Sequence, residues 1–203
     1  DLAEEVEKKG GFVSMRKLED GSESPYELNS TFYSALSDPK DEALGEARFL
    51  CSQSVALAMR GIPAVYFHSL CATANDLKGV KKTGRNRSIN RKKCEFAELE
   101  KLLEEKDGQP VRVFEWYART LRRRAACPAF HPSAPQEILD FGPSIFALER
   151  TSLDDSQVVL CLFNFQGKDT KVPDSERLRL LFPRGKARDL ISGGEVVFQE
   201  GEF

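Results

Sequence analysis

Eight basic residues gather between positions 78 and 93, and no aspartate or glutamate interrupts them. The formal net charge of the 203-residue chain is -2, so this segment concentrates positive charge in a slightly acidic protein. Arginine presents a rigid fork of donors that suits phosphate, carboxylate or vicinal hydroxyls. We therefore expect an anionic or polyhydroxylated ligand or, as for many charged runs, a solvated surface loop. The basic residues are Lys78, Lys81, Lys82, Arg85, Arg87, Arg91, Lys92 and Lys93.

A module that binds nucleic acid or another polyanion is an alternative explanation of the basic run. The sequence pI of about 5.9 speaks against it. No aromatic residue stands between the basic ones to stack on bases. We therefore predict no nucleic-acid partner. Binding of the protein to a heparin column that weakens steeply as salt is added would instead favour the nucleic-acid-binding module.

Cysteine and histidine usage bounds the chemistry further. The chain has five cysteines without a CxxC pair and two histidines, so the paired short spacings of a structural zinc site are missing. We predict reduced thiols in a cytoplasmic protein, with no metal site and no cofactor. Mean hydropathy is -0.42, and no apolar run is long enough to span a membrane. The cysteines are Cys51, Cys71, Cys94, Cys127 and Cys161.

Helices and a buried strand are expected to position the basic segment. Residues 1–9 resemble the end of a helix that stops at Gly10, and residues 19–25 carry turn formers. A longer helix is predicted from Asp38, as N-cap, to Gly61, with Pro39 at its first position. The apolar run at 64–67 predicts a strand of a parallel sheet. Two further helices are predicted over 95–106 and 111–125.

After Cys127 a proline-rich bridge leads into a segment in which we expect no helix. Apolar runs separated by turn residues predict an antiparallel β module, with the strand at 157–165 in the centre of a sandwich. The fold class is therefore α/β followed by all-β. A (β/α)8 barrel needs about 250 residues, so the α/β part is expected to be incomplete. The strands are predicted at 144–149, 157–165, 177–182 and 195–199.

Three motifs in this order give the chain a family likeness. SPYELNSTFYSALSDP stands at 24–39, GIPAVYFHSL with TGRNRSINR at 61–91, and CPAFHPSAPQEIL at 127–139. Together they resemble the sucrose phosphorylase branch of glycoside hydrolase family 13, the α-amylase superfamily. The resemblance implies that residues 1–126 are the last β/α units of a TIM (β/α)8 barrel, 127–137 a linker, and 138–203 a C-terminal β-sandwich that is incomplete at its end.

The resemblance also implies a chemistry. Such enzymes transfer an α-glucosyl unit to phosphate with retention, using an Asp nucleophile and a Glu acid/base about 5–5.5 Å apart. In the family these carboxylates precede the part that this chain resembles, so no catalytic residue is assigned here. The chain alone is expected to be inactive. An amylase-like hydrolase or transglycosylase, in which water or a sugar replaces phosphate, is the alternative enzyme.

Substrate-binding residues follow from the motifs. Arg87 matches the family arginine that contacts the hydroxyls of the glucosyl unit, and Tyr26 and Glu27 match a Tyr-Gln pair on a mobile loop. Glutamate in place of glutamine leaves sucrose, glucosylglycerate and glucosylglycerol open as substrates. Arg85 is a candidate for phosphate or a glycerate carboxylate.

Asn75 and Asp76 are candidates for sugar hydroxyls. We favour an alternative in which their side chains bond the backbone and stabilise the loop. The partners implied by the resemblance are an α-glucoside and inorganic phosphate, without a membrane. The sequence does not determine the oligomeric state.

Overall fold

The computed structural model describes residues 1–172 and 175–198. The chain divides into two compact units, one of Asp1–Leu50 with Ala64–Tyr117 and the other of Cys51–Pro63 with Ala118–Phe203. Both units include part of the long helices α3 (Glu42–Ala58) and α7 (Gln109–Ala125). The strands of the described residues pair in antiparallel fashion throughout.

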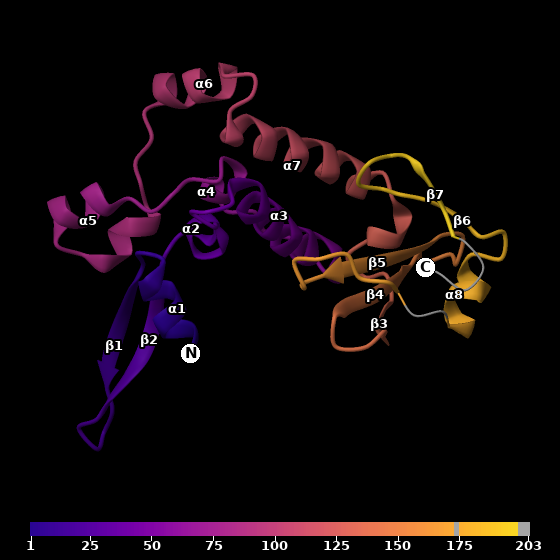
Figure 1. The fold of residues 1–203 in the computed structure, drawn as a ribbon, viewed down its shortest axis with the longest axis horizontal. Coiled ribbons are helices and arrows are strands. Elements are labelled where there is room, and N and C mark those ends of the chain that lie inside the picture. Colours follow the sequence, from indigo (N-terminus) through magenta and orange to yellow (C-terminus); the bar gives the residue numbers. More distant parts are fainter. Residues whose placement is uncertain (173–174, 199–203) are drawn as a thin grey trace. The chain divides into compact units, whose positions relative to one another are not determined.

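Short helices and one hairpin make up the rest of the first unit (Figure 1). Two expectations from the sequence are confirmed here, because helices occupy most of residues 1–9 and 95–106. The elements are α1 (Leu2–Lys8), β1 (Phe12–Lys17), β2 (Glu23–Asn29), α2 (Phe32–Leu36), α4 (Phe67–Leu70), α5 (Leu77–Thr83), the 3-10 helix η1 (Asn86–Asn90) and α6 (Phe96–Glu104).

The β1-β2 hairpin begins directly after α1, which lies beside it in Figure 1. Gly10 ends the helix region with a φ of 76°, a conformation that glycine adopts without strain. Gly11 allows close packing, because a Cβ there would lie 2.9 Å from the carbonyl oxygen of Asn29. The loop prediction for 19–25 is wrong in its second half, since β2 already starts at Glu23.

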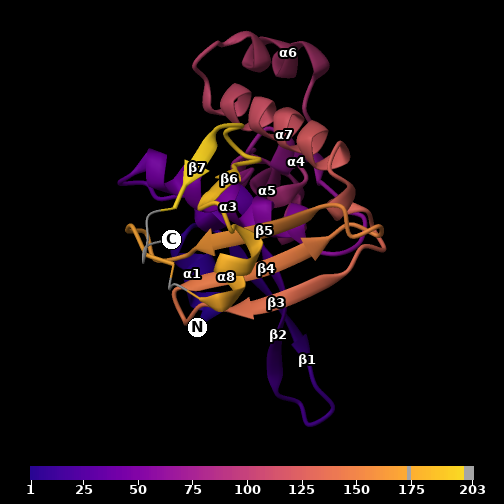
Figure 2. The ribbon, with the colours of Figure 1, turned by 90° about the vertical axis from the view of Figure 1, so that its right-hand side faces the viewer.

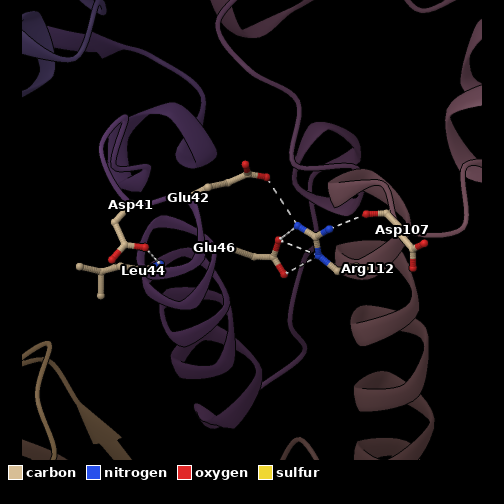
Figure 3. A network of polar contacts seen from close by, with 6 residues as sticks. All are labelled: Asp41, Glu42, Leu44, Glu46, Asp107 and Arg112. Atoms are coloured by element: carbon tan, nitrogen blue, oxygen red, sulfur yellow. Dashed lines mark hydrogen bonds and ion pairs between the residues drawn. The ribbon is translucent and has the colours of Figure 1, made fainter.

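Helix α3 starts later than the sequence predicts. Its first turn is capped by Asp41, whose Oδ1 accepts from the backbone N–H of Leu44 at 2.9 Å (Figure 3). Asp38 instead accepts from the N–H of Lys40 at 3.0 Å and closes a turn before the helix. The prediction of Asp38 as N-cap and of Pro39 at the first helical position is therefore wrong, although the helix itself is confirmed.

An ion-pair network joins the first turns of α3 and α7 within the first unit (Figure 3). The Nη2 atom of Arg112 lies 2.6 Å from Oε2 of Glu46 and 3.6 Å from Oε1 of Glu42. Arg112 also donates to the carbonyl oxygen of Asp107. Glu46 is only 15% exposed, so this pair is better shielded from water than an ordinary surface pair.

The strand predicted at 64–67 is absent from the structure. Residues 62–66 have no regular structure, and Phe67 begins helix α4. A strand of a parallel sheet needs at least one neighbouring strand that runs in the same direction and pairs with it. Within the described chain every strand pair is antiparallel, and the side chains of Tyr66 and Phe67 are 54% and 43% exposed. The apolar run therefore has no sheet to join.

The second unit is built around a three-stranded sheet of order β3-β4-β5 (Figure 2). Side chains of β4 are buried on both faces, with Ile145 and Ala147 facing one cluster and Leu148 the other. Helix α8 contributes Leu178 to the first cluster and lies across the sheet in Figure 2. The elements are η2 (Pro128–Phe130), β3 (Gln136–Asp140), β4 (Ile145–Thr151), β5 (Val158–Asn164), α8 (Glu176–Leu181), β6 (Lys186–Arg188) and β7 (Glu195–Val197).

Three of the four strands predicted for this part are confirmed, whereas the fourth strand and the central place given to 157–165 are wrong. Strands β4 and β5 match those predicted at 144–149 and 157–165, but β4 is the central strand and β5 lies at the edge. The predicted strand at 177–182 is helix α8, because Ser175 caps it by accepting from the N–H of Leu178 at 3.2 Å. The last predicted strand appears as β7, and Gln199 lies outside the described residues.

A buried arginine on β4 ties the proline-rich bridge to the sheet. The Arg150 side chain is fully buried and donates to the carbonyl oxygens of Ala58 at 2.8 Å, His131 at 3.0 Å and Pro135 at 3.2 Å. Its guanidinium also lies 5.6 Å from the ring centroid of Phe130. These backbone carbonyls compensate the buried charge and give the irregular bridge a single path.

Candidate substrate-binding site

The candidate residues Tyr26 and Glu27 lie at a β-bulge in the hairpin. Ser14 pairs with Glu27 and the next residue, Met15, pairs with Pro25, so Tyr26 is the extra residue of β2. A bulge disrupts the ladder and re-aims side chains. Tyr26 is 67% exposed, and the side chain of Glu27 is 30% exposed. Pro25 within the strand was a sequence signal for this irregularity, since proline in a strand favours an edge or a bulge.

The basic segment folds as α5 followed by η1. Asp76 caps α5 by accepting from the N–H of Gly79 at 2.8 Å, and Gly84 ends it with a φ of 67°. Ile89 is fully buried, and its carbonyl oxygen accepts from the N–H of Asp76 at 2.8 Å. The buried isoleucine anchors η1, while Arg87, two residues earlier, stays exposed.

The structure brings Arg87 and Glu27 together across 60 residues of sequence. The Nε atom of Arg87 lies 3.1 Å from Oε1 of Glu27, and the Arg87 side chain is 60% exposed. Within the part of the chain that the structure describes, no acidic side chain forms an ion pair with the other seven basic residues of the segment. Periodicity could not predict this pair, because it joins a strand and a 3-10 helix that are far apart in the sequence.

Asn75 joins the start of the basic segment to the residues after β2. Its Oδ1 accepts from the backbone N–H of Thr31 at 2.7 Å, and its own N–H donates to Oγ of Ser34 at 2.9 Å. Together with the cap that Asp76 forms, these are the side-chain-to-backbone bonds expected of a structural role. Neither residue lies in direct hydrogen-bond contact with Arg87 in the described chain.

Arg85 precedes η1 and has an exposed side chain, and it forms no ion pair with any described acidic residue. It is therefore available to an anion, but the structure does not join it to Arg87 or Glu27. The other exposed basic residues of the segment are the lysines of α5, Arg91 and the two lysines that follow it.

His68 lies in α4 and is buried, with an exposed fraction of 6%. Its Nδ1 lies 3.2 Å from Oγ1 of Thr73, and its ring contacts those of Tyr66 and Phe67 edge to face. Burial, assisted by the charge of Lys92, lowers the pKa of His68 below its ordinary value. The imidazole is therefore neutral at neutral pH and packs as a core residue.

In residues 1–172 and 175–198 no cluster of three or more His, Cys, Asp or Glu side chains could hold a metal ion. All five cysteines are free thiols. No helix of the described residues is long and apolar enough to cross a membrane.

The chain is similar to curated phosphorylases, although no family model matches it. The glucosylglycerate phosphorylase of Spirochaeta thermophila is 39% identical over 164 residues, which is 80% of this chain and 28% of that protein. The glucosylglycerate phosphorylase of Escherichia coli is 33% identical over 202 residues, covering 98% of this chain and 34% of that protein. This chain therefore spans only about a third of the length of these relatives.

A solved structure shares the fold. The crystal structure of a sucrose 6F-phosphate phosphorylase from Thermoanaerobacter thermosaccharolyticum superposes with a TM-score of 0.55 at 23% identity, over 83% of this chain and 34% of that one. The resemblance of the motifs is thus confirmed by whole-sequence similarity and by fold. Over the part that it spans, the chain is a homologue of the glucosylglycerate and sucrose phosphorylases.

Proposed function

We propose that this chain is the C-terminal part of a retaining α-glucosyl phosphorylase, which transfers glucose from an α-glucoside to inorganic phosphate and releases α-glucose 1-phosphate. The similarity to glucosylglycerate phosphorylases over nearly the whole chain carries the proposal. As part of it, residues 1–126 complete a (β/α)8 barrel, 127–137 form a linker and 138–203 form a β-sandwich. The shared fold with a sucrose 6F-phosphate phosphorylase supports this assignment.

Within the proposed site, Arg87 binds the hydroxyls of the glucosyl unit. Its exposed side chain can direct its terminal nitrogens at two adjacent oxygen atoms, which lysine cannot do with the same geometry. Tyr26 is exposed at the bulge beside Glu27 and offers an aromatic face and a hydroxyl to a sugar. Arg85 supplies a second, unpaired cation for phosphate or for the carboxylate of a glycerate.

Asn75 and Asp76 serve the same site indirectly. Their side chains hold the loop that carries Arg87, through bonds to Thr31 and Gly79. The chain supplies no residue for the nucleophile or the acid/base in this proposal. Those carboxylates belong to the remainder of the relatives' length, and residues 1–203 alone are expected to show no turnover.

Glucosylglycerate is the substrate that we favour. The relatives from Spirochaeta thermophila and Escherichia coli are both named glucosylglycerate phosphorylases, and they match 80% and 98% of this chain. A glycerate carboxylate needs a cation, and the exposed basic residues of α5 and η1 supply several. Sucrose and glucosylglycerol are the competing substrates.

The test uses the full-length polypeptide that carries residues 1–203, incubated with glucosylglycerate, sucrose and glucosylglycerol in turn. Release of glucose 1-phosphate is followed by a coupled dehydrogenase assay with and without inorganic phosphate. We expect turnover with glucosylglycerate that requires phosphate. Equal sugar release without phosphate would identify the amylase-like hydrolase instead, and no turnover with any α-glucoside would overturn the proposal.

A further inference from the structure

We infer that Glu27 is a positioning residue for Arg87. Its carboxylate pairs with the Nε atom of Arg87 and compensates the arginine's charge. Because of this compensation, Arg87 binds neutral hydroxyl groups in preference to free phosphate. This inference rests on the proposed function, in which Arg87 contacts the glucosyl unit. The carboxylate itself is not assigned to contact the reacting atoms.

The geometry of the pair leaves the arginine free to bind. Glu27 engages the Nε atom at 3.1 Å. Within the described residues the two terminal nitrogens of Arg87 donate no hydrogen bond. Those terminal N–H groups form the fork that matches two neighbouring oxygens. The pair thus fixes one edge of the guanidinium and presents the other edge.

The strand sets the position of the carboxylate. Glu27 is paired with Ser14 in the ladder, and its backbone carbonyl accepts from Nδ2 of the buried Asn29 at 3.2 Å. Its side chain is half as exposed as that of Arg87, at 30% against 60%. Glu27 is therefore the better fixed partner, and the longer, more exposed arginine side chain is the one that it orients.

The charge of Glu27 has a consequence for ligand choice. Seven other cations of the segment are exposed without an acidic partner, so free phosphate is attracted to this surface. An uncompensated Arg87 would bind that phosphate and compete with the sugar. The carboxylate at 3.1 Å opposes phosphate by like-charge repulsion but still allows hydroxyl groups to accept from the arginine.

The first test measures inhibition by phosphate in the full-length polypeptide that carries residues 1–203. For Glu27→Gln we expect phosphate to become a stronger competitive inhibitor against the α-glucoside, by roughly three- to fivefold, the range of a partly exposed ion pair. Glu23→Gln is the matched control, because Glu23 is exposed on the same strand without an ion pair among the described residues. The double variant Glu27→Gln/Arg87→Lys should lose the added inhibition.

A purely structural role for Glu27 predicts a different pattern. It would lower turnover without a change in competitive inhibition, or would change inhibition equally in Glu27→Gln and Glu23→Gln. Either pattern overturns the inference. If the parent polypeptide releases no glucose 1-phosphate, the proposed function has failed, and the pair is then judged by the second test alone.

The second test does not depend on activity. The 203-residue chain, labelled with ¹⁵N, is titrated with inorganic phosphate while the Nε–H signal of Arg87 is observed by NMR, with Arg87→Lys used for assignment. We expect Glu27→Gln to shift this signal and to strengthen phosphate binding at Arg87 by roughly three- to fivefold. An unshifted signal, or an unchanged phosphate affinity, would overturn the inference.

Discussion

Replacement of Arg150 by methionine should unfold the second unit at a lower denaturant concentration. The guanidinium donates to four backbone carbonyls, those of Ala58, His131, Ala134 and Pro135. Each hydrogen bond from a charged donor contributes about 1.5–3 kcal/mol, whereas methionine avoids the desolvation of a buried charge. Since the two effects partly cancel, we expect a net loss of about 3–5 kcal/mol, as when one partner of a buried charged contact is removed.

Hydrogen exchange of the 203-residue chain, measured by mass spectrometry on peptides of β4, would report the loss of stability in the second unit. Arg119→Met is the matched control, because Arg119 is an exposed residue of α7 in the same unit and makes no ion pair with the described residues. Arg150→Lys should fall between the two, since one ammonium group cannot reach all the carbonyls. If the amides of β4 are as well protected from exchange in Arg150→Met as in Arg119→Met, the hydrogen bonds to the bridge do not stabilise the unit and the reasoning is wrong.

Three further predictions concern single side chains. Arg112→Met should destabilise the first unit by about 1 kcal/mol at low salt and by less at high salt, because it removes the ion pair with Glu46. Urea unfolding followed by the fluorescence of the single tryptophan would measure this, and an effect that does not depend on salt would contradict it. Burial raises the pKa of Cys161 to about 12, so iodoacetamide should modify it much more slowly than Cys94; equal rates measured by peptide mass spectrometry would refute that. The pKa of His68 is lowered in the folded protein and has its ordinary value near 6.5 in the unfolded chain, so the contribution of neutral His68 to the free energy of unfolding is present above that pH and is lost as the pH falls below it. The urea midpoint should therefore drop more between pH 7.5 and 5.5 in the parent than in His68→Asn, and parallel curves would disprove this.

Features encoded by local pattern were predictable from the sequence. Helices α6 and α7 carry apolar residues at helical spacing, and Gly10 stops the first helix because it adopts a positive φ. Helix α8 was missed because six residues with one buried leucine are too few to separate a helical period from a strand. The predicted strand at 64–67 failed for another reason, since an apolar run becomes a strand only where neighbouring strands pair with it.

The sequence motifs named the candidate residues but could not predict how they are arranged. Motif likeness pointed to Arg87, Tyr26 and Glu27 separately. That Glu27 neutralises Arg87 depends on the bulge at Tyr26 and on the anchoring of η1 by Ile89, which are tertiary features. The hydrogen bonds of Asn75 are also tertiary features that local sequence patterns do not predict, because its partners lie more than 40 residues away in the sequence.

The most direct test of the account is the anomeric product of the full-length polypeptide that carries this chain. Incubated with glucosylglycerate and inorganic phosphate, and followed by ³¹P and ¹H NMR from the first turnovers, it should form the α anomer of glucose 1-phosphate, since a retaining mechanism preserves the α configuration. Replacement of Arg87 by alanine should suppress that signal. Free glucose or the β anomer as the initial product, or full activity of the Arg87→Ala variant, would contradict the account.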